Sequence, residues 1–197
     1  MAMKKLSLLF SGSKQVGIVE NTLKHMAQLS DTKKYESASE KLSEDLKALH
    51  LMLYGDPDHE ANAEDVKKLI PMILEVDKDG HNLFYKLCKH LKDLEFEAKK
   101  QASQIICFVV RKCNKSELPE YLQNHSDIFV YLMEGFEDQQ LAQHAGSVLQ
   151  EMAKRSEIGP MLFNVSLSLK KTSSTIVFKP SLQAKSSSQF LDRLCVY

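Results

Sequence analysis

Hydrophobic residues recur at helical spacing over most of this chain, and one such pattern occurs twice. Between Leu94 and Lys112 the apolar positions are Ala98, Ala102, Ile105, Ile106, Val109 and Val110. Between Glu137 and Arg155 they are Leu141, Ala145, Val148, Leu149, Met152 and Ala153, each 43 positions further along. Steps of three and four residues place such side chains on one face of an α-helix. The two stretches are therefore predicted to be amphipathic helices that repeat one another.

The segment before each of these stretches is repeated as well. Its first copy has apolar residues at Leu83, Phe84, Leu87, Cys88 and Leu91. Its second copy has them 45 positions later, at Ile128, Phe129, Leu132, Met133 and Phe136. A repeat of about 40–47 residues that carries two or three helices is typical of armadillo and HEAT proteins. Such units stack because none of them can bury its apolar face alone.

Three further helical patterns precede these repeats, over Val16–Leu29, Ala38–Leu53 and Val66–Leu74. Tyr54-Gly55-Asp56-Pro57 ends the second pattern, because glycine and proline terminate helices. Before residue 165 no alternation of apolar and polar residues is long enough to predict a strand. The fold class predicted is all-α, an armadillo/HEAT-like α-solenoid of about three helical repeats. The alternative is an ordinary helical bundle whose helices resemble one another by chance.

The two ends of the chain differ in composition from the middle. We expect a flexible N-terminal arm at 1–13, helical repeats over 14–164 and an irregular Ser/Lys-rich tail at 165–197. The tail holds eight serines in 33 residues, shows no helical period and carries five basic residues against one acidic residue. A solenoid usually closes with a repeat whose outer face is polar. Because the tail supplies no such repeat, we expect an incompletely covered apolar flank on the helix at 138–155, and self-association there.

Charge and hydropathy narrow the class of protein. The chain has 26 basic and 26 acidic residues, and the tail's excess of bases leaves the repeats mildly acidic. Nucleic-acid-binding proteins usually show a basic face, so we expect no nucleic-acid partner. The apolar run Leu6–Phe10 is shorter than a signal peptide requires, and no stretch approaches the ~20 apolar residues of a membrane span. The four cysteines form no CxxC pair, which favours buried reduced thiols. The location expected is cytoplasmic, with no membrane partner.

The sequence contains no complete catalytic or metal-binding pattern. The segment EVDKDGHNLFYK at 75–86 places Glu75, Asp77 and Asp79 at the first acidic positions of a calcium loop. Position 12 of that loop requires a bidentate glutamate, and Lys86 stands there instead. HExxH, GxSxG, P-loop and GxGxxG patterns are missing from the sequence. We therefore expect no enzyme, no metal and no cofactor.

The polar face of the repeated helix is the candidate binding surface. In the first copy it carries Lys100, Gln104, Cys107 and Arg111, and in the second copy Gln143, Ser147, Gln150 and Lys154. These residues form a polar ladder with a basic end, which is typical of the ligand-facing surface of a solenoid. The residues predicted to bind a partner on the concave face are Lys100, Gln104, Arg111, Gln143, Ser147 and Lys154. The alternative is a merely solvated helix face.

Four segments carry a resemblance to a known family. They are IVENTLKHMAQL (18–29), DLKALHLMLYGDPDHE (45–60), LEFEAKKQASQIICFVVRK (94–112) and EYLQNHSDIFVYLMEGFED (120–138). In this order and spacing, over roughly residues 14–164, the chain resembles the calcium-binding protein 39 family. These armadillo-like scaffolds are also called mouse protein twenty-five.

The resemblance implies a non-catalytic adaptor that binds kinases or pseudokinases of the sterile-twenty class and supports their active conformation. In that family the main kinase-contacting surfaces, a concave groove and a hydrophobic pocket for a Trp-Glu-Phe peptide, lie mostly on later repeats, and no position here matches them. The departure near Asn164 leaves an alternative, a truncated or alternatively spliced member with little or altered binding.

Overall fold

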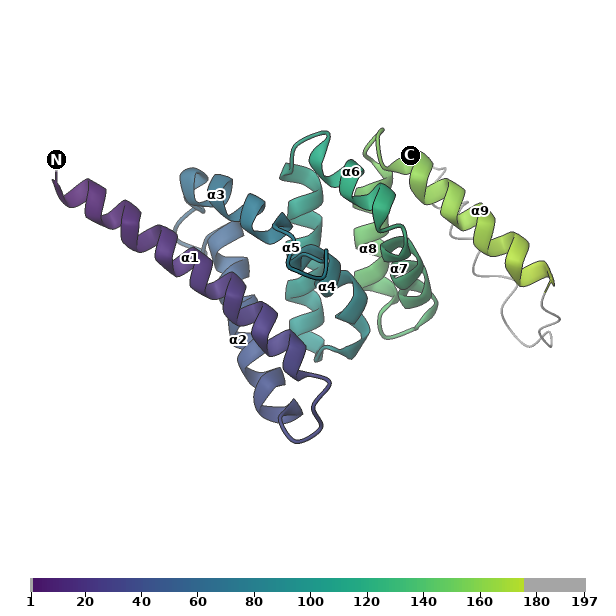
Figure 1. Cartoon of the computed structure of the whole chain (residues 1–197), viewed down its shortest axis with the longest axis horizontal. Coiled ribbons are helices and arrows are strands. Elements are labelled where there is room, and N and C mark those ends of the chain that lie inside the picture. Colours follow the sequence, from purple (N-terminus) through teal and green to yellow (C-terminus); the bar gives the residue numbers. More distant parts are fainter. Residues whose placement is uncertain (1, 176–197) are drawn as a thin grey trace. The chain divides into compact units, whose positions relative to one another are not determined.

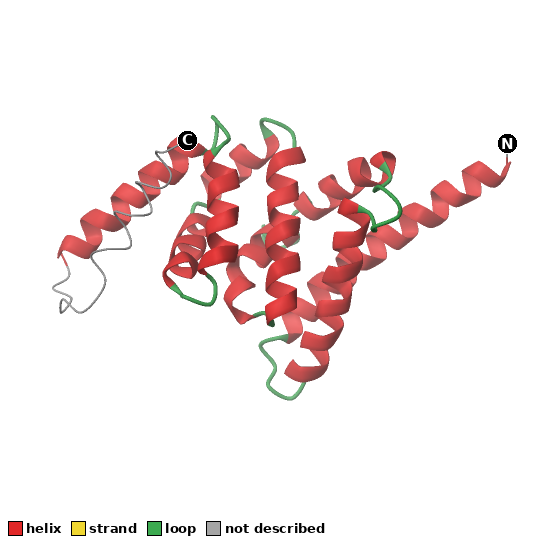
Figure 2. Ribbon diagram, turned by 180° about the vertical axis from the view of Figure 1, so that it is seen from behind, coloured by secondary structure: helices red, strands yellow, loops and turns green. Residues whose placement is uncertain are grey.

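The computed structural model describes the backbone of residues 2–175 and the side chains of residues 15–169. Every regular element in this part of the chain is helical, as Figures 1 and 2 show. The helices are α1 Ala2–Gln28, α2 Tyr35–Tyr54, α3 Ala63–Leu74, α4 Leu83–His90, α5 Phe96–Lys112, α6 Glu117–Asn124, α7 Asp127–Glu137, α8 Ala142–Ala153 and α9 Gly159–Thr175, with a 3₁₀ turn at Leu91–Asp93. The predicted all-α class of helical repeats is confirmed.

The chain divides into two compact units, and residues 1–114 form the first. Within it α2 is central, because both α1 and α5 pack against it. The apolar stripe predicted for α2 is buried in full and consists of Ala38, Leu42, Leu46, Leu49 and Leu53. Burial of a leucine side chain contributes about 1.5–3 kcal/mol, so this stripe is a main source of the unit's stability.

Residues 115–197 form the second unit, in which α7 and α8 pack on each other and α9 packs on both. Ile158 and Leu162 are buried at this contact. On α8 itself Val148, Leu149 and Met152 have no exposed surface. The expectation of an incompletely covered flank on this helix was therefore wrong, because the chain that follows forms one more helix.

The repeat predicted from apolar spacing reappears in the pattern of burial. All six apolar positions of α5 are buried, and five of the six equivalent positions of the second copy are buried as well, Ala153 being half-buried. A third helix precedes each pair, α3 before α4 and α5 in the first unit and α6 before α7 and α8 in the second. Helix α6 was not expected from the sequence, because it buries only Leu118 and Leu122 as large apolar residues and so leaves almost no periodic signal.

Helices extend past the predicted boundaries near both ends of the chain. Helix α1 begins at Ala2, within the segment 1–13 that was expected to be a flexible arm. Helix α9 continues to Thr175, so the segment after residue 164 begins as helix; residues 176–197 lie outside the described part. Ser166 and Ser168 donate their hydroxyls to backbone carbonyls of the preceding turn, at 2.8 and 3.0 Å, so serines are accommodated inside this helix.

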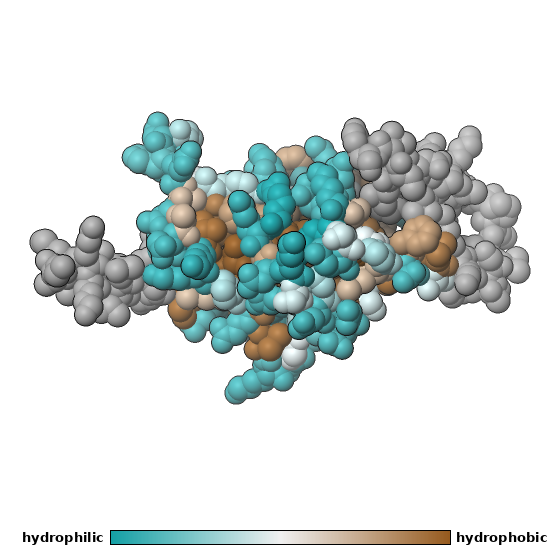
Figure 3. All heavy atoms as spheres, turned by 90° about the horizontal axis from the view of Figure 1, so that it is seen from above, coloured by the Kyte–Doolittle hydropathy of each residue, from teal (hydrophilic) through white to brown (hydrophobic). Residues whose placement is uncertain are grey.

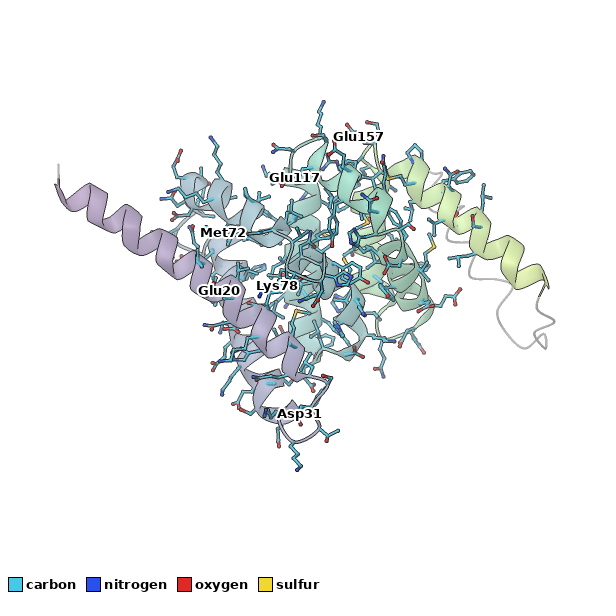
Figure 4. The ribbon with its side chains drawn as sticks, in the orientation of Figure 1. Glu20, Asp31, Met72, Lys78, Glu117 and Glu157 are labelled. Carbon is cyan, nitrogen blue, oxygen red and sulfur yellow. The ribbon has the colours of Figure 1, made fainter. Side chains whose placement is uncertain are left out.

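The connections between helices are short and polar. Figure 4 labels Asp31 between α1 and α2, Lys78 between α3 and α4, and Glu157 between α8 and α9. In the view of Figure 3 hydrophilic side chains cover most of the surface that is coloured, and hydrophobic residues reach it in separate patches. Among the described residues, no helix combines the length and the apolar character that crossing a bilayer requires.

Candidate partner-binding face

In the first unit the predicted face is built from two helices rather than one. Lys100 and Arg111 are exposed on α5, and Gln104 between them is half-buried. The end of α2 contributes Tyr54, whose hydroxyl donates to the backbone carbonyl of Gln104 at 3.0 Å. Arg111 Nη2 donates in turn to the Tyr54 hydroxyl at 2.8 Å. These two hydrogen bonds hold the guanidinium group in one place on the surface.

Aromatic rings support this arrangement from α2 and α5. The His50 ring stacks on Tyr54, with ring centroids 4.5 Å apart and an interplanar angle of 16°. Phe108 packs against Tyr54 in an edge-to-face arrangement, with ring centroids 4.9 Å apart. Aromatic pairs in such geometries contribute about 0.5–1.5 kcal/mol beyond the area they bury. The tyrosine that positions Arg111 is therefore itself fixed by packing.

The charge on this face comes from its lysine and its arginine. Desolvation lowers the pKa of His50, a hydrogen bond with Gln104 opposes the shift, and the charge of Lys100 lowers the pKa further. The imidazole is therefore neutral at pH 7. Lys100 pairs with Glu97 at 3.5 Å in an exposed ion pair, whereas Arg111 bonds to a neutral hydroxyl. The positive potential is consequently strongest at the Arg111 end.

In the second unit two of the predicted residues lie on α8, and Lys154 directly follows it as the C-cap residue. Gln143, Ser147 and Lys154 are all exposed there. The Ser147 hydroxyl donates to the carbonyl of Gln143 at 2.8 Å, and Lys154 Nζ lies 2.8 Å from a carboxylate oxygen of Glu151. The structure thus brings together the three predicted residues of α5 and the three of α8, each set within its own unit.

One residue of the face was assigned wrongly and two were missed. Cys107 was expected on the polar side of α5 and is buried, with 8% of its surface exposed. Cys88 and Cys113 are also buried, and burial raises the pKa of the Cys88 thiol. His50 and Tyr54 were missed, because they come from a helix about 50 positions away. The only signal for them in the sequence is two rings four residues apart at the end of an apolar helix.

The calcium-like loop between α3 and α4 is closed by its own side chains. Asp77 Oδ1 accepts hydrogen bonds from the backbone amides of Asp79 and His81, at 2.9 and 3.0 Å. Its other oxygen lies 2.5 Å from Lys86 Nζ, so the lysine at loop position 12 neutralises the carboxylate at position 3. Nowhere in the described chain do three or more histidine, cysteine, aspartate or glutamate side chains gather closely enough to hold a metal ion.

The fold and this surface define a helical-repeat protein with an exposed polar face along its long helices. The model of the Mo25-like family matches residues 9–189 of the 197-residue chain. The chain therefore belongs to the Mo25-like family. The match extends beyond Asn164, so the expectation that the resemblance ends there was wrong.

Three relatives illustrate the similarity. The mouse protein named calcium-binding protein 39-like is 29% identical over 164 residues, which cover 81% of this chain and 47% of that protein. The Mo25-like protein of Schizosaccharomyces pombe is 31% identical over 127 residues, 64% of this chain and 37% of that protein. The MO25-like protein 2 of Caenorhabditis elegans is 28% identical over 128 residues, 64% and 36% respectively. The chain spans about half the length, or less, of these relatives.

Proposed function

We propose that this chain is a non-catalytic scaffold that binds a protein kinase or pseudokinase of the sterile-twenty class and supports its active conformation in the cytoplasm. Membership of the Mo25-like family supports a scaffold role in general. The observation that supports a binding surface is the Arg111 guanidinium, exposed yet held by the Tyr54 hydroxyl at 2.8 Å. The proposal includes no cofactor, no metal, no nucleic acid and no membrane.

The face on α2 and α5 suits a partner element with acceptor groups and an apolar side. Arg111 and Lys100 would bind carboxylates or carbonyl oxygens, and the side chain of Gln104 would offer both a donor and an acceptor. The stacked rings of His50 and Tyr54 would pack against the partner's apolar atoms. Because Arg111 is already positioned, less side-chain entropy is lost when the partner binds. On α8, Gln143, Ser147 and Lys154 would extend the same mode of binding.

A scaffold supports an active conformation by binding it more tightly than the inactive one. A ligand can shift a conformational equilibrium only by its difference in affinity for the two states. A tenfold difference corresponds to about 1.4 kcal/mol, which is enough to change a minor state into a substantial one. No group of this chain has to take part in the phosphoryl transfer.

The test is a calorimetric titration of a sterile-twenty-class kinase or pseudokinase domain into the full chain. We expect micromolar or tighter binding, weakened at least tenfold by Arg111→Glu and also weakened by Lys154→Glu. Lys67→Glu is the matched control, because Lys67 is exposed on α3, which carries none of these residues, and the same reversal of charge should leave binding unchanged.

A folded chain that gives no binding heat would contradict the proposal, provided that circular dichroism shows the helices. That result would favour the alternative, a family member with little or altered kinase binding. Equal weakening by Lys67→Glu would mean that net charge, rather than this face, governs the interaction.

A further inference from the structure

A pocket of about 370 Å³ lies beside the connection between α2 and α3, within the first unit. This volume is at the lower end of the range for ligand sites, and it suits a single side chain rather than a larger molecule. The lining residues that carry the argument are Gln15 of α1, Leu51 and Met52 of α2, Asp56 and Glu60 of the connection, and Asp65 of α3.

The connection that forms one wall is held in shape by its own hydrogen bonds. Gly55 has a φ of 83°, and a Cβ atom there would lie 2.3 Å from the carbonyl oxygen of His59. Asp56 Oδ1 accepts from the backbone amides of Asp58 and His59, both at 2.9 Å. The backbone then pairs Gly55 with Glu60 in an isolated bridge. The wall is therefore preformed, which lowers the entropic cost of binding.

Gln15 gives the pocket an unused acceptor. Its side chain is 2% exposed, and its Oε1 has no hydrogen-bond partner in the described structure. Its Nε2 makes one long donation to the backbone carbonyl of Asp65, at 3.5 Å. A buried acceptor without a partner costs about 1–3 kcal/mol, so a donor entering the pocket would recover part of that energy. The terminal torsion of glutamine is broad, and rotation about it can turn Oε1 towards the pocket.

The charges around the pocket point to a cationic donor. Three lining residues carry carboxylates, Asp56, Glu60 and Asp65, and among the described side chains no lysine or arginine lines the pocket. Asp56 is occupied by the loop and by His59, whose Nδ1 lies 3.1 Å from Oδ1, but Glu60 is exposed and forms no ion pair within the described residues. Leu51 is a large exposed apolar residue at the rim.

We propose that this pocket binds the guanidinium group of an arginine side chain presented by a basic segment of a partner protein. The N–H groups of the planar fork bond to the Glu60 carboxylate and to Gln15 Oε1, a geometry that a point-like ammonium matches less well. The apolar stem of the arginine lies against Leu51 and Met52. The site is separate from the face of Lys100, Gln104 and Arg111, so it stands or falls independently of the kinase-binding proposal.

The test is a titration of the full chain with the peptide acetyl-Gly-Arg-Gly-amide, followed by amide chemical shifts in NMR. We expect saturable shifts at the backbone amides of Gly55, Glu60 and Asn62 and at the side-chain amide of Gln15. A single arginine should bind with a Kd on the order of 1 mM, because partly exposed ion pairs are weak. The counterpart with citrulline, which keeps the shape and removes the charge, should give no saturable shift.

Variants then separate the pocket from general charge and from loss of folding. Glu60→Gln should weaken the arginine peptide at least threefold, whereas Glu75→Gln, an exposed glutamate just after α3, should not. Gln15→Met should weaken binding while leaving thermal stability unchanged or higher, because it removes the unpartnered acceptor. A third peptide, with lysine in place of arginine, should bind more weakly than the arginine peptide. Any one of three results would overturn the proposal: no saturable shift with the arginine peptide, equal binding of the citrulline or lysine peptide, or equal weakening by Glu75→Gln.

Discussion

Arg111 owes its fixed position to Tyr54, a residue 57 positions earlier in the sequence. A free arginine on a helix surface samples many rotamers, and it loses that freedom when it binds a partner. Here a neutral hydroxyl holds the guanidinium without neutralising it. This hydrogen bond makes Arg111 a candidate binding group. The apolar periodicity of the sequence alone does not reveal the bond.

The Asp77–Lys86 pair should make stability depend on pH. Its hydrogen bond with Lys86 holds the pKa of Asp77 below its ordinary value. The folded protein therefore keeps this carboxylate charged at acidities that protonate it in the unfolded chain. The resulting stabilisation is present above the unfolded pKa, about 4, and is lost as the pH falls through the lower folded value.

We expect Asp77→Asn to lower the free energy of unfolding by about 1 kcal/mol at pH 7, a usual size for such a pair. The difference from the wild type should shrink as the pH falls below about 4. Urea unfolding at neutral and acidic pH measures it. Asp79→Asn, two residues away and outside this ion pair, is the control. A deficit that is equally large at both pH values would contradict the linkage.

At the scale of elements, the helix ends are set by a few residues with special backbone conformations. Gly55 and Gly80 both have positive φ, 83° and 76°. A Cβ atom at Gly55 would collide with the backbone at His59, whereas at Gly80 nothing lies within 4 Å. Substitution of Gly80 by alanine therefore tests the cost of the positive φ alone. Substitution of Gly55 tests that cost together with the cost of a steric clash.

We expect Gly80→Ala to cost about 1 kcal/mol, the usual conformational penalty for alanine at positive φ. Gly55→Ala should cost more, at least about 2 kcal/mol, because the connection to α3 must also move. Chemical denaturation of the two variants gives the comparison. Equal losses would mean that the turn at Gly55 relaxes freely.

The sequence predicted those elements whose apolar residues follow a regular period. Helices α2, α4 and α5 were predicted in this way, because Leu46, Leu87 and Ile106 and their neighbours all face a buried side. Helix α6 was not predicted, because Leu118 and Leu122 are its only large buried apolar residues and leave almost no periodic signal. Helix was also not predicted for the first residues of α1 and for the segment 165–175. The reason there is that both helices include glycine or serine, which locally weaken the helical signal.

The candidate site could be predicted only in part. Apolar spacing identified the exposed residues of α5 and α8 as the side opposite the core. The contribution of α2 to that face, and the pocket beside Gln15, depend on tertiary contacts between segments about 50 positions apart. No local pattern encodes such contacts, so a single sequence could not reveal them.

At the scale of the whole molecule, the outer side of α9 raises the question of self-association. The inner side of the helix buries Leu162, whereas Phe163 is 50% exposed and Leu167, one turn further, is exposed as well. Two large apolar residues four positions apart form a stripe that a second copy could cover. The self-association expected from the sequence stays a prediction, now placed on α9 instead of the flank of α8.

We expect the chain to associate reversibly with itself, and Phe163→Glu to weaken that association at least tenfold. Burial of a phenylalanine contributes about 1.5–3 kcal/mol, which exceeds the roughly 1.4 kcal/mol of a tenfold change. Sedimentation equilibrium over a range of concentrations measures it. Phe96→Glu is the matched control, because Phe96 is 69% exposed but lies at the start of α5 in the other unit. A chain that stays monomeric throughout would contradict the prediction. An equal effect of Phe96→Glu would mean that exposed aromatic residues in general, rather than a surface on α9, cause the association. Phe163 lies on α9, whereas Phe96 does not.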